Sequence, residues 1–243
     1  MTVITIEGRI GSGTTEVGRL VAKELEIDYV DRLLLADIAR RVGTTVEALA
    51  DTERRVPSRA SRFAYRIQRM LQRSAVAGMG GDPYFGPGIE TLLARPYHDL
   101  EEPPATSAEE VDERRFIDTT REVITDLAEI GNVVILSRGG AAILRDRPSV
   151  LRVGLTAHQQ DRVRRIMERE RLTEEDAVKW IEHSDSAQLR YFKKAFNTCP
   201  LDRFLYHFML HTSEIGVEYA TKLIVDTARL MTDEGLPRGP EPA

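Results

Sequence analysis

A glycine-rich segment near the N-terminus constrains the fold more than any other part of this sequence. It runs from Glu7 to Thr15, follows the apolar, β-branched run Val3–Ile6, and precedes a helical pattern of apolar residues from Val17 to Leu25. Strand, glycine-rich turn and helix in this order form the context of a phosphate-binding loop. Glycines let the backbone approach an anion closely, and the helix start directs N–H groups and a positive dipole end toward it. We therefore predict that this segment binds phosphate.

The segment differs at one position from the usual phosphate-loop pattern G-x-x-x-x-G-K-[ST]. Gly8 and Gly13 match its glycines, and Thr15 takes the place of the hydroxyl that faces Mg²⁺. Thr14 stands where the pattern has lysine, so the main positive charge is missing. A glycine turn without a ligand is the alternative interpretation. The predicted nucleotide-binding residues are Gly8, Gly11, Ser12, Gly13, Thr14 and Thr15.

Composition excludes several classes of protein. The chain has 243 residues, 42% of them hydrophobic and 30% charged, as expected of a soluble globular protein. It has no apolar run as long as a membrane span and no signal-peptide pattern. The single cysteine, Cys199, excludes an internal disulfide framework and fits a reducing cytoplasm. The net charge of −5 argues against a nucleic-acid binder with a largely basic surface.

Strand-like and helical patterns alternate along the chain. Apolar runs at 3–6, 27–32, 133–136, 150–155 and 205–210 predict five strands. Helical patterns separate them, without hairpin signals, which predicts a parallel sheet covered on both faces. Ser107 can cap one helix, Thr173 opens another with a capping box, and Thr212 and Ser213 can cap the last. The tail 232–243 is predicted to be disordered.

The middle of the chain carries an arginine stripe beside an apolar helix face. The arginines at 55, 59, 62, 66, 69 and 73 follow helical spacing. The stripe could hold an anionic substrate, with Arg62 and Arg66 as candidates, or it could be a solvated or dimer-paired face. Residues 77–106 are rich in glycine and proline, so they predict a long loop that serves as a lid, a binding segment or a disordered region.

Polar residues follow two of the predicted strands directly. Asp31 and Arg32 end the second strand, and Arg138 follows the third. Ligands of open parallel sheets gather at the carboxyl ends of the strands. These residues are therefore candidates for contact with substrate.

Taken together, these segments resemble the nucleoside-monophosphate kinases, and most closely the cytidylate kinase-like family. The loop resembles that family's variant, in which an acidic residue often precedes the first glycine and the lysine tends to be absent. Further matches are Tyr29–Arg32, the strand from Val133 to Gly139, the arginine-rich helix after it, and the segment from Asp185 to Tyr191. The resemblance spans about residues 1–50 and 107–230.

The resemblance implies a three-layer P-loop NTPase fold of α/β class, with a five-stranded parallel sheet. The kinase core would comprise residues 1–50 and 107–231, with a monophosphate-binding insertion at 51–106 and a mobile lid at about 162–200. The acceptor would lie between loop, insertion and lid. Thr14 differs from the general P-loop pattern, Gly139 replaces an expected aspartate, and Gln188 replaces an expected lid arginine.

The leading hypothesis is a kinase that uses ATP and Mg²⁺. It would transfer the γ-phosphate to a nucleoside monophosphate, CMP- or dCMP-like, or to a similar small acceptor. Thr15 and Glu7 would serve the metal, and Glu7 or Asp31 would act through metal-bound water or the acceptor. The candidates to replace the lysine charge are Arg9, Arg138, Arg162, Arg165 and Arg169. The acceptor candidates are Asp31, Arg32, Arg62, Arg66, Asp185 and Arg190.

Other interpretations remain open at this point. The missing lysine fits a nucleotide-binding sensor or scaffold with little or no transfer activity. The arginine stripe fits a nucleic-acid-binding module, which the net charge disfavours, or the interface of a homodimer. Each arginine alone could also form an ordinary surface ion pair.

Overall fold

The computed structural model describes residues 1–31, 107–232 and 234–236. The chain divides into two compact units, of which one contains Met1–Tyr29 and Gly131–Ala243 and the other contains the helix α5 (Ser107–Ile130). The predicted insertion 51–106, with Arg62, Arg66 and the rest of its arginine stripe, lies outside the described residues, and so does Arg32.

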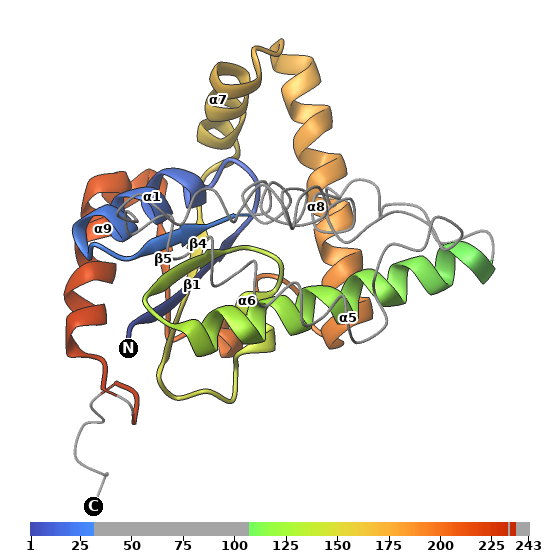
Figure 1. Ribbon diagram of the computed structural model, residues 1–243. Coiled ribbons are helices and arrows are strands. Elements are labelled where there is room, and N and C mark those ends of the chain that lie inside the picture. The colour runs from blue at the N-terminus through green and yellow to red at the C-terminus, as the bar shows by residue number, and fades with distance from the viewer. Residues whose placement is uncertain (32–106, 233, 237–243) are drawn as a thin grey trace, which may run out of the picture. The chain divides into compact units, whose positions relative to one another are not determined.

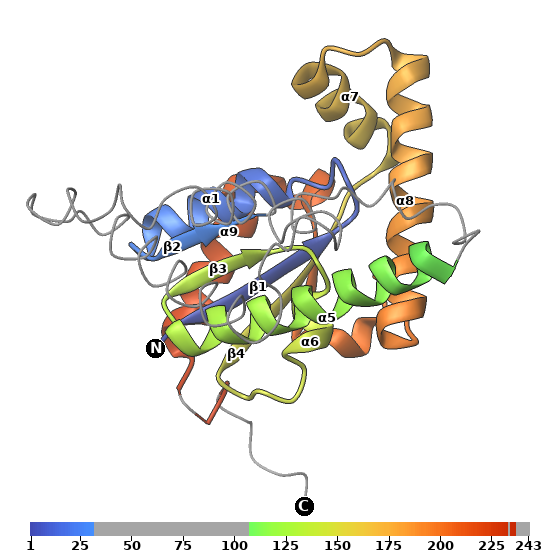
Figure 2. The same ribbon diagram turned by 45° about the vertical axis from the view of Figure 1, so that its right-hand side comes forward.

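The first unit is built on a five-stranded parallel sheet in the order β2-β3-β1-β4-β5 (Figures 1 and 2). The strands are β1 (Val3–Gly8), β2 (Asp28–Val30), β3 (Val133–Leu136), β4 (Val150–Thr156) and β5 (Phe208–His211). The central strand β1 pairs in parallel with both β3 and β4. This order puts the glycine-rich segment at the middle of the sheet's carboxyl edge, and the sheet is parallel, as the sequence predicts.

The strand before the last helix begins later than predicted. Residues Arg203–Leu205 form a 3₁₀ turn, η4, and β5 starts at Phe208. The carboxylate of Asp202 causes this, because its Oδ1 accepts a hydrogen bond of 3.0 Å from the Phe204 N–H and holds the backbone in a turn.

Helices cover the sheet on both faces. The helices α1 (Thr14–Glu24) and α9 (Thr212–Leu230) pack on one face, where Ile4 and Ile6 of β1 meet Val21 and Ile224. The short helix α6 (Gly140–Ile143) lies on the opposite face, where Gly140 packs against the side chains of Thr5 and Ile135. The alternating β-branched residues of β1 thus point to both layers.

Two helices after β4 form a hairpin that projects beyond the sheet (Figure 1). We call α7 (Gln159–Glu170) and α8 (Glu174–Phe196) the lid hairpin, since they coincide with the predicted lid. Val163 and Ile166 of α7 form a small core with Ala177 and Ile181 of α8. The predicted cap of α8 is confirmed, because Thr173 Oγ1 accepts from the Asp176 N–H at 3.2 Å. The lid hairpin therefore has its own packing and cap.

The second unit contains helix α5. Helix α5 begins at Ser107, as predicted, and buries Val123, Ile124 and Leu127.

Contrary to the predicted disorder from residue 232, Thr232 bridges to Gly235 and Leu236 packs on the core, whereas residues 237–243 lie outside the described part. None of the described helices is both long enough and apolar enough to cross a lipid bilayer.

Candidate functional site

The segment between β1 and α1 has the backbone geometry of an anion-binding loop. Gly11 and Gly13 lie in the left-handed region, with φ of +79° and +86°. The Ser12 N–H donates to the Arg9 carbonyl at 3.0 Å, which closes a turn. Helix α1 starts at Thr14 without a side-chain cap, so its first N–H groups remain available to a ligand.

Three glycines of the loop have two different reasons to be glycine. A Cβ on Gly8 would lie 2.7 Å from the Leu155 carbonyl, and one on Gly11 would lie 2.8 Å from the Arg162 carbonyl. Close packing against β4 and α7 thus requires these two. A Cβ on Gly13 would meet no atom nearer than 3.5 Å, so at Gly13 the backbone conformation alone requires glycine.

These features fit a polyphosphate group. The start of α1 has no side-chain cap, and Thr15 lies half-buried in the first turn of this helix. Ser12 is fully buried, and within the described residues no group hydrogen-bonds to its Oγ. A buried hydroxyl without a partner is costly, and an oxygen-rich ligand would satisfy it.

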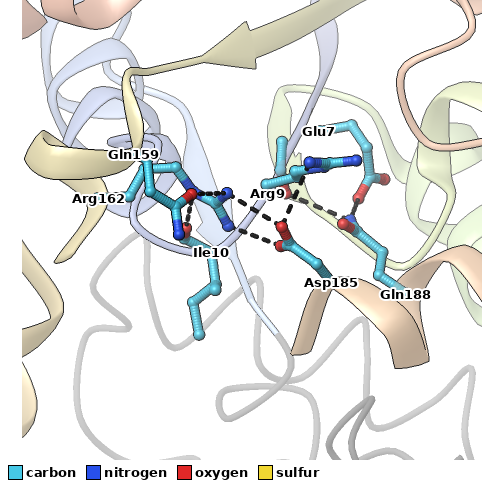
Figure 3. A network of polar contacts seen from close by, with 8 residues as sticks. Glu7, Arg9, Ile10, Gln159, Arg162, Asp185 and Gln188 are labelled. Atoms are coloured by element: carbon cyan, nitrogen blue, oxygen red, sulfur yellow. Dashed lines mark hydrogen bonds and ion pairs between the residues drawn. The ribbon is translucent and has the colours of Figure 1, made fainter. Parts of the chain in front are cut away.

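A buried arginine joins the lid hairpin to the loop (Figure 3). Arg162 of α7 is only 4% exposed, and its Nε donates to the Ile10 carbonyl at 2.8 Å. Its Nη1 and Nη2 donate to the carboxylate of Asp185 on α8, at 3.0 and 2.6 Å. Arg9 of the loop approaches the same carboxylate at 3.4 Å. Arg162 and Asp185, predicted as catalytic and acceptor residues, are thus placed to position the loop.

A second arginine of α7 contacts the loop from another side. Arg165 Nη1 donates to the Gly11 carbonyl at 3.0 Å and to Thr212 Oγ1 at 3.2 Å. Thr212 Oγ1 donates in turn to the Ser12 carbonyl at 2.8 Å. The Arg165 Nη1 would lie 3.6 Å from a Cβ on Gly13. The predicted Arg165 is thus bound to the loop backbone beside Gly13.

A buried acid lies at the end of β1. Glu7 is 1% exposed, its Oε2 accepts from the Gly139 N–H at 2.9 Å, and its Oε1 accepts from Gln188 Nε2 at 3.0 Å. Burial raises the pKa of Glu7 to about 8, although both hydrogen bonds and the charge of Arg138 oppose the rise. Ligation of Mg²⁺ by Glu7, which the sequence predicts, would require this carboxyl to lose its proton.

The turn after β3 is strained. Ser137, Arg138 and Gly139 follow one another with φ of +61°, +64° and +73°. A non-glycine residue in this region costs on the order of 1–3 kcal/mol and is typical of functional sites. Arg138 is buried, and its carbonyl accepts from the Tyr191 hydroxyl at 3.1 Å. The strained turn thus holds the predicted Arg138 against α8 and near Glu7.

The structure describes three other predicted residues. Arg169 is at the far end of α7, where its Nε donates to Glu170 at 2.8 Å. Arg190 is half-buried on α8, near Lys193 and Lys194. Asp31 follows β2 and is half-buried.

Sequence reasoning missed the structural roles of Gln188 and Thr212. Gln188 is noticeable in the sequence only as the absence of an expected arginine, and Thr212 only as a helix cap. Gln188 contacts Glu7, which is 181 positions away in the sequence, and Thr212 contacts Ser12, which is 200 positions away. Local patterns carry no signal for such contacts.

Comparisons with known proteins agree with this architecture. A family model described as the cytidylate kinase-like family matches residues 3–214. A solved structure of an uncharacterized protein from Eubacterium ventriosum is 16% identical, with a TM-score of 0.58 over 94% of this chain and 99% of that one. At this identity the likeness shows a shared fold alone.

Two further solved structures have lower TM-scores. TT1252 from Thermus thermophilus is 21% identical, with a TM-score of 0.45 over 93% of this chain and 96% of that one. Shikimate kinase from Acinetobacter baumannii is 13% identical, with a TM-score of 0.41 over 92% of this chain and 91% of that one. No curated protein matches the sequence.

Proposed function

The chain belongs to the cytidylate kinase-like family, and from this premise we propose that it is a phosphotransferase that uses ATP and Mg²⁺. The acceptor is a nucleoside monophosphate of the CMP or dCMP type, or a similar small phosphate-bearing molecule. One observation carries the proposal: a phosphate loop without lysine has an arginine of the lid hairpin, Arg165, bound directly to its backbone.

The loop residues would hold the donor. Backbone N–H groups from Gly11 to Thr15 would surround the phosphates at the uncapped start of α1, and the Thr15 hydroxyl would ligate Mg²⁺. Bound ATP supplies the phosphoryl group, and the protein contributes position and charge rather than covalent chemistry. The buried contacts of Arg162 and Thr212 keep the loop backbone in place for this task.

Arginines supply the positive charge that Thr14 does not. Arg9 and Arg162 share the single carboxylate of Asp185, which leaves one net positive charge beside the loop. Arg165 adds a second charge beside Gly11 and Gly13. A fixed guanidinium fits phosphate oxygens well, because its planar fork donates two parallel hydrogen bonds.

A coupled assay tests the activity directly. The purified protein is given ATP, Mg²⁺ and a panel of nucleoside monophosphates, and ADP formation is followed while calorimetry measures ATP binding. We expect ADP formation that depends on the acceptor. ATP binding without turnover on any acceptor would instead support the sensor alternative, for which Thr14 is the motivating observation.

The variant Gly13→Val tests the assignment of the loop. We expect it to lose ATP binding, because a branched side chain is strained at φ +86° and would distort the backbone that holds the phosphates. Gly216→Val is the matched control, since Gly216 in α9 has a φ of +77° and a Cβ there would lie no nearer than 3.7 Å to the Glu218 side chain. Equal ATP affinity in Gly13→Val and the control, with both folded, would refute the loop as the donor site.

A further inference from the structure

Two histidines and a glutamate converge where the lid hairpin and the last helix begin. His158 precedes α7, His211 ends β5, and Glu214 lies in the first turn of α9. One potential ligand atom from each residue lies within 4.8 Å of the other two. Neither the phosphate loop nor the proposed acceptor residues include any of the three.

The backbone that carries these side chains is fixed by other contacts. Thr156 of β4 pairs with His211 of β5, and Thr212 Oγ1 donates to the Thr156 carbonyl at 3.3 Å. The His158 N–H donates to Ser213 Oγ at 2.9 Å. The two turns therefore stay side by side without help from the three ligand side chains.

The side chains can adopt the spacing of a metal site. His158 Nε2 lies 2.7 Å from Glu214 Oε1, which is a hydrogen-bond distance, whereas ligand atoms around tetrahedral Zn²⁺ lie about 3.4 Å apart. His158 and Glu214 are 60% and 64% exposed, so rotation about their side-chain bonds can open this pair. The His211 ring lies against the His158 ring, with centroids 4.4 Å apart.

His211 supplies an independent observation. Its Nδ1 is buried, and no group among the described residues hydrogen-bonds to it. A buried ring nitrogen that lacks a partner is unfavourable. Binding of an ion through one ring nitrogen would fix the tautomer and orientation of this imidazole.

We infer that His158, His211 and Glu214 form a binding site for one transition-metal ion of the Zn²⁺ class, with water as the remaining ligand. Two imidazoles and one carboxylate are a common zinc ligand set, whereas Mg²⁺ prefers oxygen ligands alone. The site is thus chemically distinct from any magnesium that would accompany a nucleotide, and it does not depend on the proposed kinase activity.

Calorimetric titration of metal-stripped full-length protein tests the site, in the absence of nucleotide. We expect one Zn²⁺ ion per chain and no comparable binding of Mg²⁺. His158→Gln, His211→Gln and Glu214→Gln should each weaken Zn²⁺ binding by at least the roughly 10–100-fold that loss of an outer-shell partner costs. His183→Gln, which removes an exposed histidine of α8 outside the cluster, should bind Zn²⁺ like the wild type.

Co²⁺ provides a second readout through its visible absorption bands, which strengthen when its site is tetrahedral. We expect these bands in the wild type and in His183→Gln, and their loss in His158→Gln. Circular dichroism confirms that the variants are folded, which the exposure of His158 and Glu214 favours. Absence of stoichiometric Zn²⁺ binding in the wild type would overturn the inference, as would a double variant of both histidines that still binds Zn²⁺ normally.

Discussion

Arg165 shows how a single side chain can change the electrostatics of a loop. Its guanidinium is held by the Gly11 carbonyl and by Thr212, so its charge has a fixed position beside Gly13. A charge fixed before the substrate binds stabilises a transition state better than a mobile one, since no reorganisation is needed. Because lysine is absent from the loop, this residue is where we expect a substitution to affect phosphoryl transfer most.

The first residue-scale prediction is that Arg165→Gln lowers kcat/KM by about 10²–10³-fold, the usual effect of removing one preorganised electrostatic contact. Steady-state kinetics with the best acceptor measure this effect. Arg164→Gln is the matched control on the same helix, because Arg164 is 64% exposed and pairs with Asp161. Equal kinetics in both variants would show that Arg165 serves the loop backbone alone.

Glu7 gives a second prediction, on the pH dependence of stability. Its pKa is about 8 in the folded protein against an ordinary value of 4.5, so unfolding releases its proton between these pH values. This carboxyl therefore makes the free energy of unfolding fall as the pH rises from about 4.5 to 8, by at most about 1.4 kcal/mol per pH unit.

We expect Glu7→Gln to flatten that dependence, because an amide has no proton to release. Urea unfolding of both proteins at several values between pH 5 and pH 8 measures it. Glu182→Gln, at an exposed position of α8, should keep the wild-type slope. The same slope in Glu7→Gln and the wild type would mean that Glu7 is ionised in the folded protein over this range.

At the scale of elements, one ion pair joins both helices of the lid hairpin to the loop. Arg162 of α7 donates to the Ile10 carbonyl of the loop and to the Asp185 carboxylate of α8, so the two helices and the loop meet at one guanidinium. Arg165 of α7 and Gln188 of α8 add hydrogen bonds to the Gly11 and Gly8 carbonyls. Motion of the lid hairpin relative to the sheet would therefore change these contacts together.

The element-scale prediction is that Asp185→Asn destabilises the protein more than the double variant Asp185→Asn with Arg162→Met. Loss of one partner from a buried pair leaves a charge without compensation and costs up to about 3–5 kcal/mol, whereas replacing Arg162 as well removes that charge. Urea unfolding measures the difference. Glu175→Gln is the control, since its pair with Lys179 is exposed and contributes about 0.3–0.5 kcal/mol. A double variant that is the least stable of all would contradict this account.

At the scale of the whole molecule, the sequence is informative where structure is local. The β-branched run before Gly8 and the glycines after it suffice to predict a strand, a loop and a helix, and the capping box at Thr173 predicts the start of α8. The predicted start of β5 was wrong because the carboxylate of Asp202 holds the backbone in a turn where the apolar pattern predicts a strand.

The candidate site is less predictable, since it depends on contacts between distant segments. The sequence names Arg9, Arg162, Arg165 and Asp185 as functional candidates, but which of them bind each other depends on how α7 and α8 pack. Gln188 is the clearest case. Its amide donates to Glu7, and this neutral amide favours the ionised form of the buried acid less than the charge of an arginine would.

The position of β1 in the sheet has a consequence for synthesis of the chain. Val3 pairs with Val133 on one side and with Val150 on the other, so β1 is made well before either of its neighbours β3 and β4. At usual translation rates of about 5–20 residues per second, the 130 positions between Val3 and Val133 correspond to roughly 6–26 s. During that time both edges of the apolar strand β1 lack their final neighbours, which is a condition for aggregation. We therefore expect the yield of folded protein to depend on chaperones that shield the nascent β1.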